Sequence, residues 1–198
     1  MGYSLIGMAA VVGAGEAHGL NMKAAQAGLG GAVFQMFNHG TISAMLFILV
    51  GVIYERAHHR EIDGFGGLAS QMPIYTGITA VAFFAGLGLP GLSGFISEAM
   101  CFIGAFPVYK GIVIASTIGI LLNAAYFLWA FQRIFFGNLN EKYSDLSDIN
   151  RLELLTVIPL LLITLFFGIY PTPYINAISS TMDVIINHVV SMATFASM

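Results

Sequence analysis

Long apolar segments separated by short polar stretches make up most of this chain. A helix crosses a bilayer when it has roughly 20 mostly apolar residues. Residues 24–54 and 111–132 meet this condition as single membrane-spanning helices, and residues 154–170 form a shorter one. Residues 3–13 are apolar but too few to cross alone, so we expect a truncated helix at that position.

Residues 74–106 form an apolar segment of a different kind. As one straight helix this segment would be about 50 Å long, well beyond the roughly 30 Å hydrocarbon core. Its middle is rich in glycine, which disfavours a helix, and contains Pro90, which removes a backbone donor. We therefore predict one discontinuous membrane helix, of the kind that commonly marks ion sites. The residues of the predicted break are Gly88, Pro90, Gly91 and Gly94.

The polar stretches predict the remaining organisation of the chain. Residues 15–23 and 138–153 are expected to be loops. From Ile175 to Val189, apolar residues recur at three- and four-residue spacing, with polar residues on the opposite side. This pattern predicts an amphipathic helix on the membrane surface or against a partner subunit. The chain thus divides into a transmembrane portion, residues 1–174, and an interfacial tail, residues 175–198.

Composition and charge support an all-α membrane protein with about five transmembrane helices. The chain is 58% hydrophobic and 9% charged, and its mean hydropathy is +0.85. Its scattered basic residues and pI near 5.9 argue against nucleic-acid binding, which needs a clustered basic face. Cys101 is the single cysteine, so neither an internal disulfide nor a cysteine metal motif can form. The adjacent pair His58-His59 lacks the spacing of metal ligands on one helical face, and no metal site is predicted.

Basic residues predict the orientation in the membrane, because they collect in cytoplasmic loops. Only Lys23 and Lys110 lie in the loops that would face outward. The loops on the other side, which we expect to be cytoplasmic, carry Arg56, Arg60, Arg133, Lys142 and Arg151.

Among the Asp, Glu, Lys, Arg and His residues of the chain, only His39 and Glu98 lie inside the long apolar segments. An ionisable group within a bilayer costs several kcal/mol and is a functional-site hypothesis by default. Glu98 follows the predicted break, and a carboxyl group in such surroundings can load and release protons. The alternative for Glu98 is a packing role, with its carboxyl group hydrogen-bonded between helices.

His39 is the second candidate on a proton path, because a histidine can relay protons near neutral pH. The alternative is a neutral histidine satisfied by a backbone carbonyl. Uncharged polar side chains in the spans usually join helices by hydrogen bonds, although some could order water between the two candidates. The candidates for this polar support are Asn38, Thr41, Ser97 and Tyr126.

Three motifs resemble one family of membrane proteins. They are residues 89–98 (Leu-Pro-Gly-Leu-Ser-Gly-Phe-Ile-Ser-Glu), residues 31–40 (Gly-Ala-Val-Phe-Gln-Met-Phe-Asn-His-Gly) and residues 133–137 (Arg-Ile-Phe-Phe-Gly). Together they closely resemble the chain-4-type, or M-type, proton-translocating membrane subunits of NADH:quinone oxidoreductase, respiratory complex I. The resemblance runs from residue 1 to about residue 174, and the glutamate at position 98 points to the M type.

The resemblance implies a fold of fourteen helices in two inverted repeats, each with a broken helix. This chain would hold the last five helices, half of the antiporter-like fold. Glu98 would then be the proton-exit residue, and His39 would lie on the polar axis that leads to it. The first repeat and its central lysines are missing, so we expect a fragment, a split gene product or a truncated gene model.

The expected function is that of a proton-translocating subunit, driven by quinone reduction elsewhere in the complex. The chain would carry no cofactor, while NADH, FMN, iron–sulfur clusters and quinone would bind other subunits. Its partners would be the other membrane-arm subunits, including the L and N subunits, in a bacterial inner membrane. The alternatives are a subunit of a multisubunit cation/proton antiporter or membrane-bound hydrogenase, and a purely structural membrane scaffold.

Overall fold

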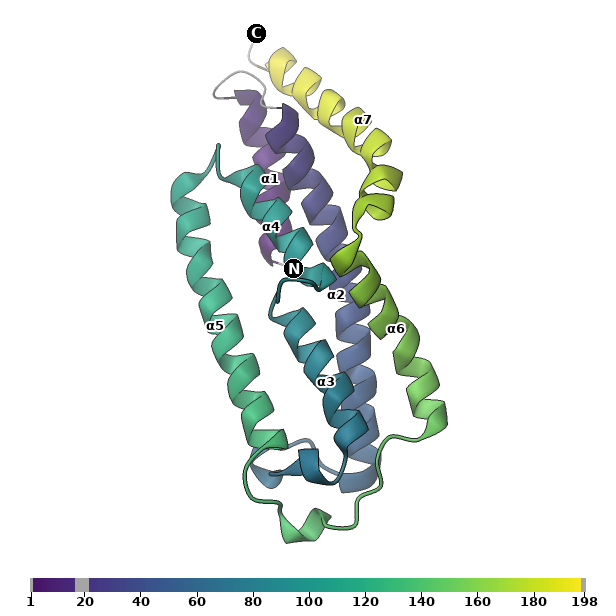
Figure 1. Cartoon of the computed structure of the whole chain (residues 1–198). Helices are drawn as coiled ribbons and strands as arrows, with labels where there is room; N and C mark the ends of the chain where they lie inside the picture. Colours follow the sequence, from purple (N-terminus) through teal and green to yellow (C-terminus); the bar gives the residue numbers. More distant parts are fainter. Residues whose placement is uncertain (1, 17–21, 197–198) are drawn as a thin grey trace.

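The computed structural model describes residues 2–16 and 22–196, and Figure 1 shows them as an elongated helical bundle. Its α-helices are α1 (Gly2–Glu16), α2 (Met22–Ala57), α3 (Pro73–Gly86), α4 (Ser93–Ala105), α5 (Lys110–Phe135), α6 (Arg151–Ile169) and α7 (Thr172–Ala196). Three short 3-10 turns, η1 (Ile62–Gly64), η2 (Leu68–Ser70) and η3 (Glu141–Tyr143), lie in the connections at one end. Helices α2, α5 and α6 are long and apolar enough to cross a membrane. The prediction of an all-α membrane protein is confirmed.

The predicted discontinuous helix is present as α3 and α4, separated by residues 87–92. Pro73 opens α3 in its first turn, where its missing N–H group has no helical partner to lose. Between the helices, Gly88 and Gly91 have φ angles of +81° and +95°. L-residues with a Cβ rarely adopt such angles, so these glycines let the chain turn sharply in the middle of the bundle.

Helix α2 is the central element and contacts α1, α3, α4, α6 and α7. It packs most closely on α1 and α4, through glycine. A Cβ added at Gly28 would lie 2.7 Å from the carbonyl oxygen of Gly7, and one added at Gly104 would meet the backbone of Gly28. Small residues permit such close helix contacts in membranes, where helices must associate without a hydrophobic driving force between them. The broken helix is therefore held firmly along one side of α2.

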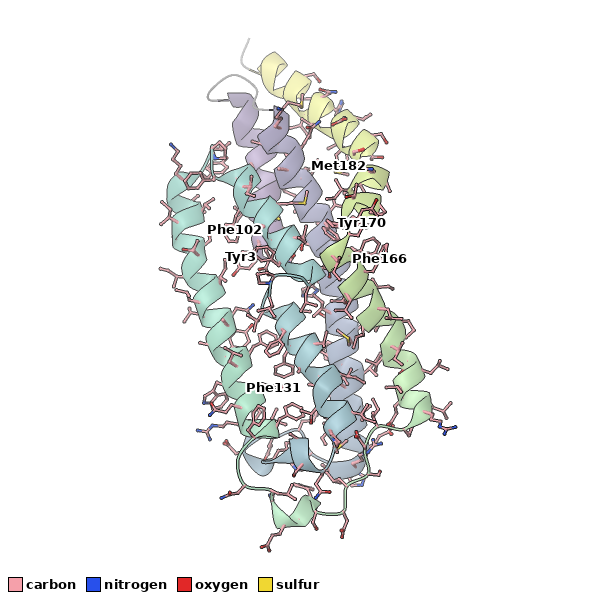
Figure 2. The ribbon with its side chains drawn as sticks, viewed as in Figure 1. Tyr3, Phe102, Phe131, Phe166, Tyr170 and Met182 are labelled. Carbon is pink, nitrogen blue, oxygen red and sulfur yellow. The ribbon has the colours of Figure 1, made fainter. Side chains whose placement is uncertain are left out.

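Helix α7 confirms the predicted C-terminal helix and packs on the same chain, while its place at the membrane surface or against a partner stays a prediction. Its buried Met182 and Ile186 form one apolar cluster with Val11 of α1 and with Ala25 and Leu29 of α2. Figure 2 shows Met182 on the side of α7 that faces these helices. The predicted periodicity was sufficient to find the apolar side of this helix but not the surface that covers it. The division of the chain at residue 174 stays a prediction.

The predicted loop at residues 15–23 is wrong at both ends. Gly15 and Glu16 continue α1, and α2 already begins at Met22. Glycine near the end of a helix is tolerated at a modest cost, so Gly13 and Gly15 did not stop α1. The centre of this loop, residues 17–21, lies outside the described residues.

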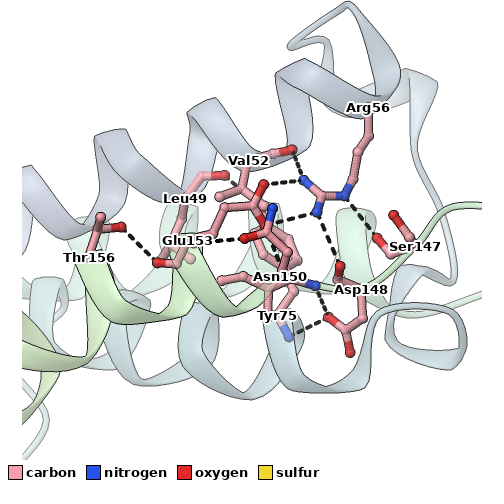
Figure 3. A network of polar contacts seen from close by, with 10 residues as sticks. Leu49, Val52, Arg56, Tyr75, Ser147, Asp148, Asn150, Glu153 and Thr156 are labelled. Atoms are coloured by element: carbon pink, nitrogen blue, oxygen red, sulfur yellow. Dashed lines mark hydrogen bonds and ion pairs between the residues drawn. The ribbon is translucent and has the colours of Figure 1, made fainter.

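A polar network joins the chain segments at the lower end in Figure 1, and Figure 3 shows it from close by. Arg56, near the end of α2, donates two hydrogen bonds to the Glu153 carboxylate, at 2.9 and 2.8 Å. It also donates to the carbonyl oxygens of Ser147 and Asp148, at 2.8 and 3.1 Å. The Asp148 carboxylate in turn accepts from the backbone N–H groups of Ile74 and Tyr75 at the start of α3. Helices α2, α3 and α6 are thus joined through one set of side chains.

Helix α6 begins at Arg151, three positions before the predicted start at residue 154, because Asn150 and Glu153 cap its first turn. Asn150 accepts a hydrogen bond from the backbone N–H of Glu153, and the Glu153 carboxylate accepts one from the backbone N–H of Asn150. This reciprocal capping box satisfies backbone donors that a helix start leaves unpaired. The charged residues that suggested a loop are therefore the cap and first turn of α6.

Candidate functional site

Glu98 lies in the second turn of α4, directly after the break, and its residue is only 8% exposed. Its carboxylate rests against Gly88. A Cβ added to Gly88 would lie 2.6 Å from Glu98 Oε2, closer than real contacts allow. Gly88 therefore has two functions here, since it adopts a positive φ and leaves the space that the carboxylate fills.

Glu98 also lines a cavity of about 800 Å³ between α1, α2, α4 and α5. His39, Tyr126 and Gly94 line the same cavity, so the structure brings four of the sequence-predicted site residues together. Other polar side chains around this space are Tyr3, Gln35, Ser43, Ser116 and Asn123. A space of this size has room for several water molecules.

One side of α2 forms a wall of the cavity. Gln35, His39, Ser43 and Leu46 line it at spacings of three and four residues, as expected for neighbours on one helical face. His39 is exposed on this face, and its Nδ1 atom lies 3.5 Å from Ser43 Oγ, at the outer limit of a hydrogen bond. The His39 ring is therefore free to exchange its hydrogen-bond partners within the cavity.

Asn38 and Ser97 have a different place, in the contact between α2 and α4. Asn38 Nδ2 donates to the carbonyl oxygen of Ser93 and to Ser97 Oγ, both at 2.9 Å. Ser97 Oγ donates in turn to the side chain of Gln35. These bonds are buried and tie the start of α4 to the α2 face that carries His39. Asn38 and Ser97 thus position the two candidate residues relative to each other.

Helix α5 supports the other side of the break. Asn123 Nδ2 donates a 3.0 Å hydrogen bond to the carbonyl oxygen of Gly86, the last residue of α3. Carbonyl oxygens at the end of a helix lack an internal partner, and inside a membrane they need one from elsewhere in the protein. Of the remaining predicted support, Tyr126 stacks on Phe127, whereas Thr41 donates to carbonyl oxygens of its own helix.

Sequence reasoning missed the contributions of Tyr3 and Gln35. The Tyr3 ring packs against Phe102 with a centroid separation of 5.1 Å, and Figure 2 shows this pair beside the break. Gln35 could have been found, because it lies one helical turn before His39 and shares its face. Tyr3 could not, since only the packing of α1 brings it to the cavity.

Few charged side chains line the cavity around Glu98. Among the residues that line the cavity, none is lysine or arginine, and Glu98 is the only carboxylic acid. We find no hydrogen-bond donor to its carboxylate among residues 2–16 and 22–196. The same residues contain no group of three or more His, Cys, Asp or Glu side chains that could hold a metal ion. The arrangement suits proton exchange with water and His39, because no side chain of the described residues donates a hydrogen bond to the carboxylate.

The fold and the site define a class, that of membrane proteins with a broken helix and an acidic residue beside the break. The family described as "NADH:quinone oxidoreductase/Mrp antiporter, TM" matches residues 1–123, and the chain belongs to this family. Similar relatives include "NADH-quinone oxidoreductase subunit M" from Rhodobacter capsulatus, 40% identical over 173 residues, covering 86% of this chain and 34% of that protein. "F(420)H(2) dehydrogenase subunit M" from Methanosarcina mazei is 35% identical over 187 residues, covering 94% of this chain and 35% of that protein.

A solved structure agrees with the same fold. "Respiratory complex I from Thermus thermophilus with bound NADH" contains a chain that superposes with a TM-score of 0.77 at 25% sequence identity. The superposition covers 93% of this chain and 44% of the other. This coverage confirms the prediction of half of an antiporter-like fold. The chain spans about a third of the length of its curated relatives.

Proposed function

We propose that this chain forms the C-terminal membrane portion of a proton-translocating subunit of NADH:quinone oxidoreductase. One observation carries the proposal: the Glu98 carboxylate lies at a helix break, without a hydrogen-bond donor among residues 2–16 and 22–196, on a cavity that it shares with His39. An ionisable residue inside a membrane is energetically costly and usually functional, and proton exchange is the function that the geometry favours. The names of the relatives support the assignment to this complex.

The proton path that we propose uses groups of this chain in sequence. A proton reaches the His39 ring, passes to water in the cavity, and is accepted by a carboxylate oxygen of Glu98. Glu98 becomes neutral, then releases the proton to the opposite side and regains its charge. Asn38, Ser97 and Gln35 hold α2 against α4, so that donor and acceptor keep their separation while protonation changes.

The surroundings that we propose for the chain follow from its relatives. Quinone reduction would take place on other subunits, which would also hold NADH, FMN and the iron–sulfur clusters. The partners would be other membrane-arm subunits, including those of the L and N types, in a bacterial inner membrane. The other repeat of the antiporter-like fold would supply the entry half of the path.

A second candidate function is that of a cation/proton antiporter or membrane-bound hydrogenase subunit. The family description includes the Mrp antiporter, and one relative belongs to a dehydrogenase that is named for F(420)H(2). In each case Glu98 and His39 would do the same chemistry, and only the reaction that drives proton movement would differ.

The proposal is tested in membrane vesicles that carry the complete complex, with Glu98→Gln in this chain. Glutamine keeps the shape of the side chain but cannot take up and release a proton at cellular pH. We expect proton uptake coupled to NADH oxidation to fall by an order of magnitude or more, in line with the loss of an acid–base group. The matched control is Glu55→Gln, at an exposed glutamate near the end of α2. Unchanged uptake in the Glu98 variant would contradict the proposal and favour the alternative of a purely structural membrane scaffold.

A further inference from the structure

A groove at the end of α5 has no part in the proton path. It has a volume of about 730 Å³, within the range of pockets that hold small molecules. It lies at the lower end of the bundle in Figure 1, between the last turns of α5 and the turn η1. Its polar lining comes from Asp63, Gln132, Arg133 and Asn138, and its apolar lining includes Trp129 and Phe136.

Trp129 and Arg133 are paired on one face of α5. The Arg133 guanidinium lies over the Trp129 ring at 4.8 Å from its centroid, which is a cation–π contact. Tryptophan is enriched where a membrane helix meets the headgroup region, and its ring lies at that depth. Above this pair, α5 has a strongly apolar side away from the Glu98 cavity, with Ile114 and Leu121 exposed by 61% and 72%. The groove therefore opens where the acyl chains of lipids end and their headgroups begin.

Within the described chain, most N–H donors of the Arg133 side chain are available to a ligand. Its one ion pair within the described chain is a 3.4 Å contact to Asp63, and the two side chains are 54% and 83% exposed. A pair this exposed contributes little stability. Arginine carries five N–H donors in a planar fork that suits the oxygens of a phosphate group. The Asp63 carboxylate is an internal acceptor that a phosphate would replace.

We propose that this groove binds the headgroup of an anionic phospholipid, with its phosphate on Arg133 and its acyl chains along α5. Gln132 and Asn138 provide amide donors at the rim of the groove. The apolar face of α5 provides the surface for the chains, so one molecule satisfies both halves of the site. A free phosphate would use Arg133 but leave the apolar part uncovered.

The chain contains its own probe of this site, since Trp129 is its single tryptophan. Lipids with brominated acyl chains quench tryptophan fluorescence on contact. We would reconstitute the full chain into vesicles and compare brominated phosphatidylglycerol, which is anionic, with brominated phosphatidylcholine, which is not. A basic group near the membrane surface favours an anionic lipid by about fivefold in binding constant, and we expect a preference of that size.

Three variants make the test specific. Arg133→Gln should reduce the preference to about one, and Asp63→Asn should increase it, because the competing carboxylate is lost. Arg151→Gln removes the same charge from the start of α6, outside the groove, and should leave the preference unchanged. Circular dichroism would establish that each variant retains its helices.

Three results would overturn the proposal. The first is equal quenching by the two lipids in the unsubstituted chain, and the second is a preference that survives in Arg133→Gln. The third is relief of the quenching by added inorganic phosphate, which would assign the site to a free anion. Relief by unbrominated phosphatidylglycerol alone is the result that the proposal requires.

Discussion

Two glutamates near the ends of helices, Glu153 and Glu98, have opposite surroundings. Glu153 accepts two hydrogen bonds from Arg56 and one from the backbone of Asn150, and both partners of its ion pair are almost buried. Glu98 is buried beside Gly88 at a helix break and lines a cavity without a cationic neighbour among its lining residues. The comparison indicates that Glu153 is held by its partners and joins helices, whereas the proposal requires Glu98 to change its charge state.

The largest expected effect is on stability, and it separates the two glutamates directly. Arg56→Gln leaves the Glu153 carboxylate without its cation and removes the donors to Ser147 and Asp148. We expect the free energy of unfolding to fall by about 3 kcal/mol, as is usual when one partner of a nearly buried pair is lost. Glu98→Gln should cost less than about 0.5 kcal/mol, since it breaks no hydrogen bond within the described chain.

Denaturant unfolding of the reconstituted chain, followed by circular dichroism, measures both changes. Combining Arg56→Gln with Glu153→Gln in a double-mutant cycle isolates the energy of the pair. The comparison breaks down if Glu98→Gln destabilises the chain as much as Arg56→Gln does, because Glu98 would then be a structural residue too.

A smaller expected effect concerns the position of the Glu98 carboxylate. Gly88→Ala introduces a Cβ that would lie 2.6 Å from Glu98 Oε2, at a φ of +81°. The carboxylate must move, so proton uptake in the complete complex should fall nearly as far as in Glu98→Gln. The unfolding free energy should fall by about 1 to 2 kcal/mol from the backbone strain.

The matched control for this change is Gly91→Ala. Gly91 has a similar φ of +95°, but a Cβ added there meets open space. This variant should show the loss of stability and keep most of its proton uptake. If the two alanine variants lose uptake equally, then uptake depends on the backbone bend and not on the position of the Glu98 carboxylate.

The smallest expected effect is on the support that α5 gives to the break. Asn123→Ala removes the donor to the carbonyl oxygen of Gly86 and should cost about 1 kcal/mol of unfolding free energy. Ser116→Ala is the control on the same helix, because its hydroxyl group bonds to the carbonyl oxygen of Ile112 within α5. A larger loss in the serine variant would show that the Asn123 bond does not hold the break.

The sequence was sufficient to predict the broken helix and the two ionisable residues beside it. Both depend on local signals, namely the glycines around Pro90 and the rarity of charges in apolar segments. It did not reveal the pairing of Arg56 with Glu153, which lie 97 positions apart and read as ordinary loop charges. The packing of α7 on α1 and α2 was hidden for a similar reason, since an amphipathic pattern does not identify the surface that covers it.

The candidate site was predicted in part. His39 and Glu98 do share a cavity, and their role in proton exchange stays a prediction. Asn38 and Ser97 were expected as general polar support, and the structure gives them a specific place between α2 and α4. Thr41 makes its hydrogen bonds within its own helix, a use of hydroxyl groups that is common in membrane helices and invisible in the residue type alone.

The central claim is that Glu98 changes its protonation during turnover while Glu153 does not. Infrared difference spectroscopy of the complete complex, resting against turning over, measures this through the carbonyl stretch of protonated carboxyl groups. We predict a change in this band that disappears in Glu98→Gln and persists in Glu153→Gln. A band that remains in Glu98→Gln, or the absence of any change in this region, would contradict the account.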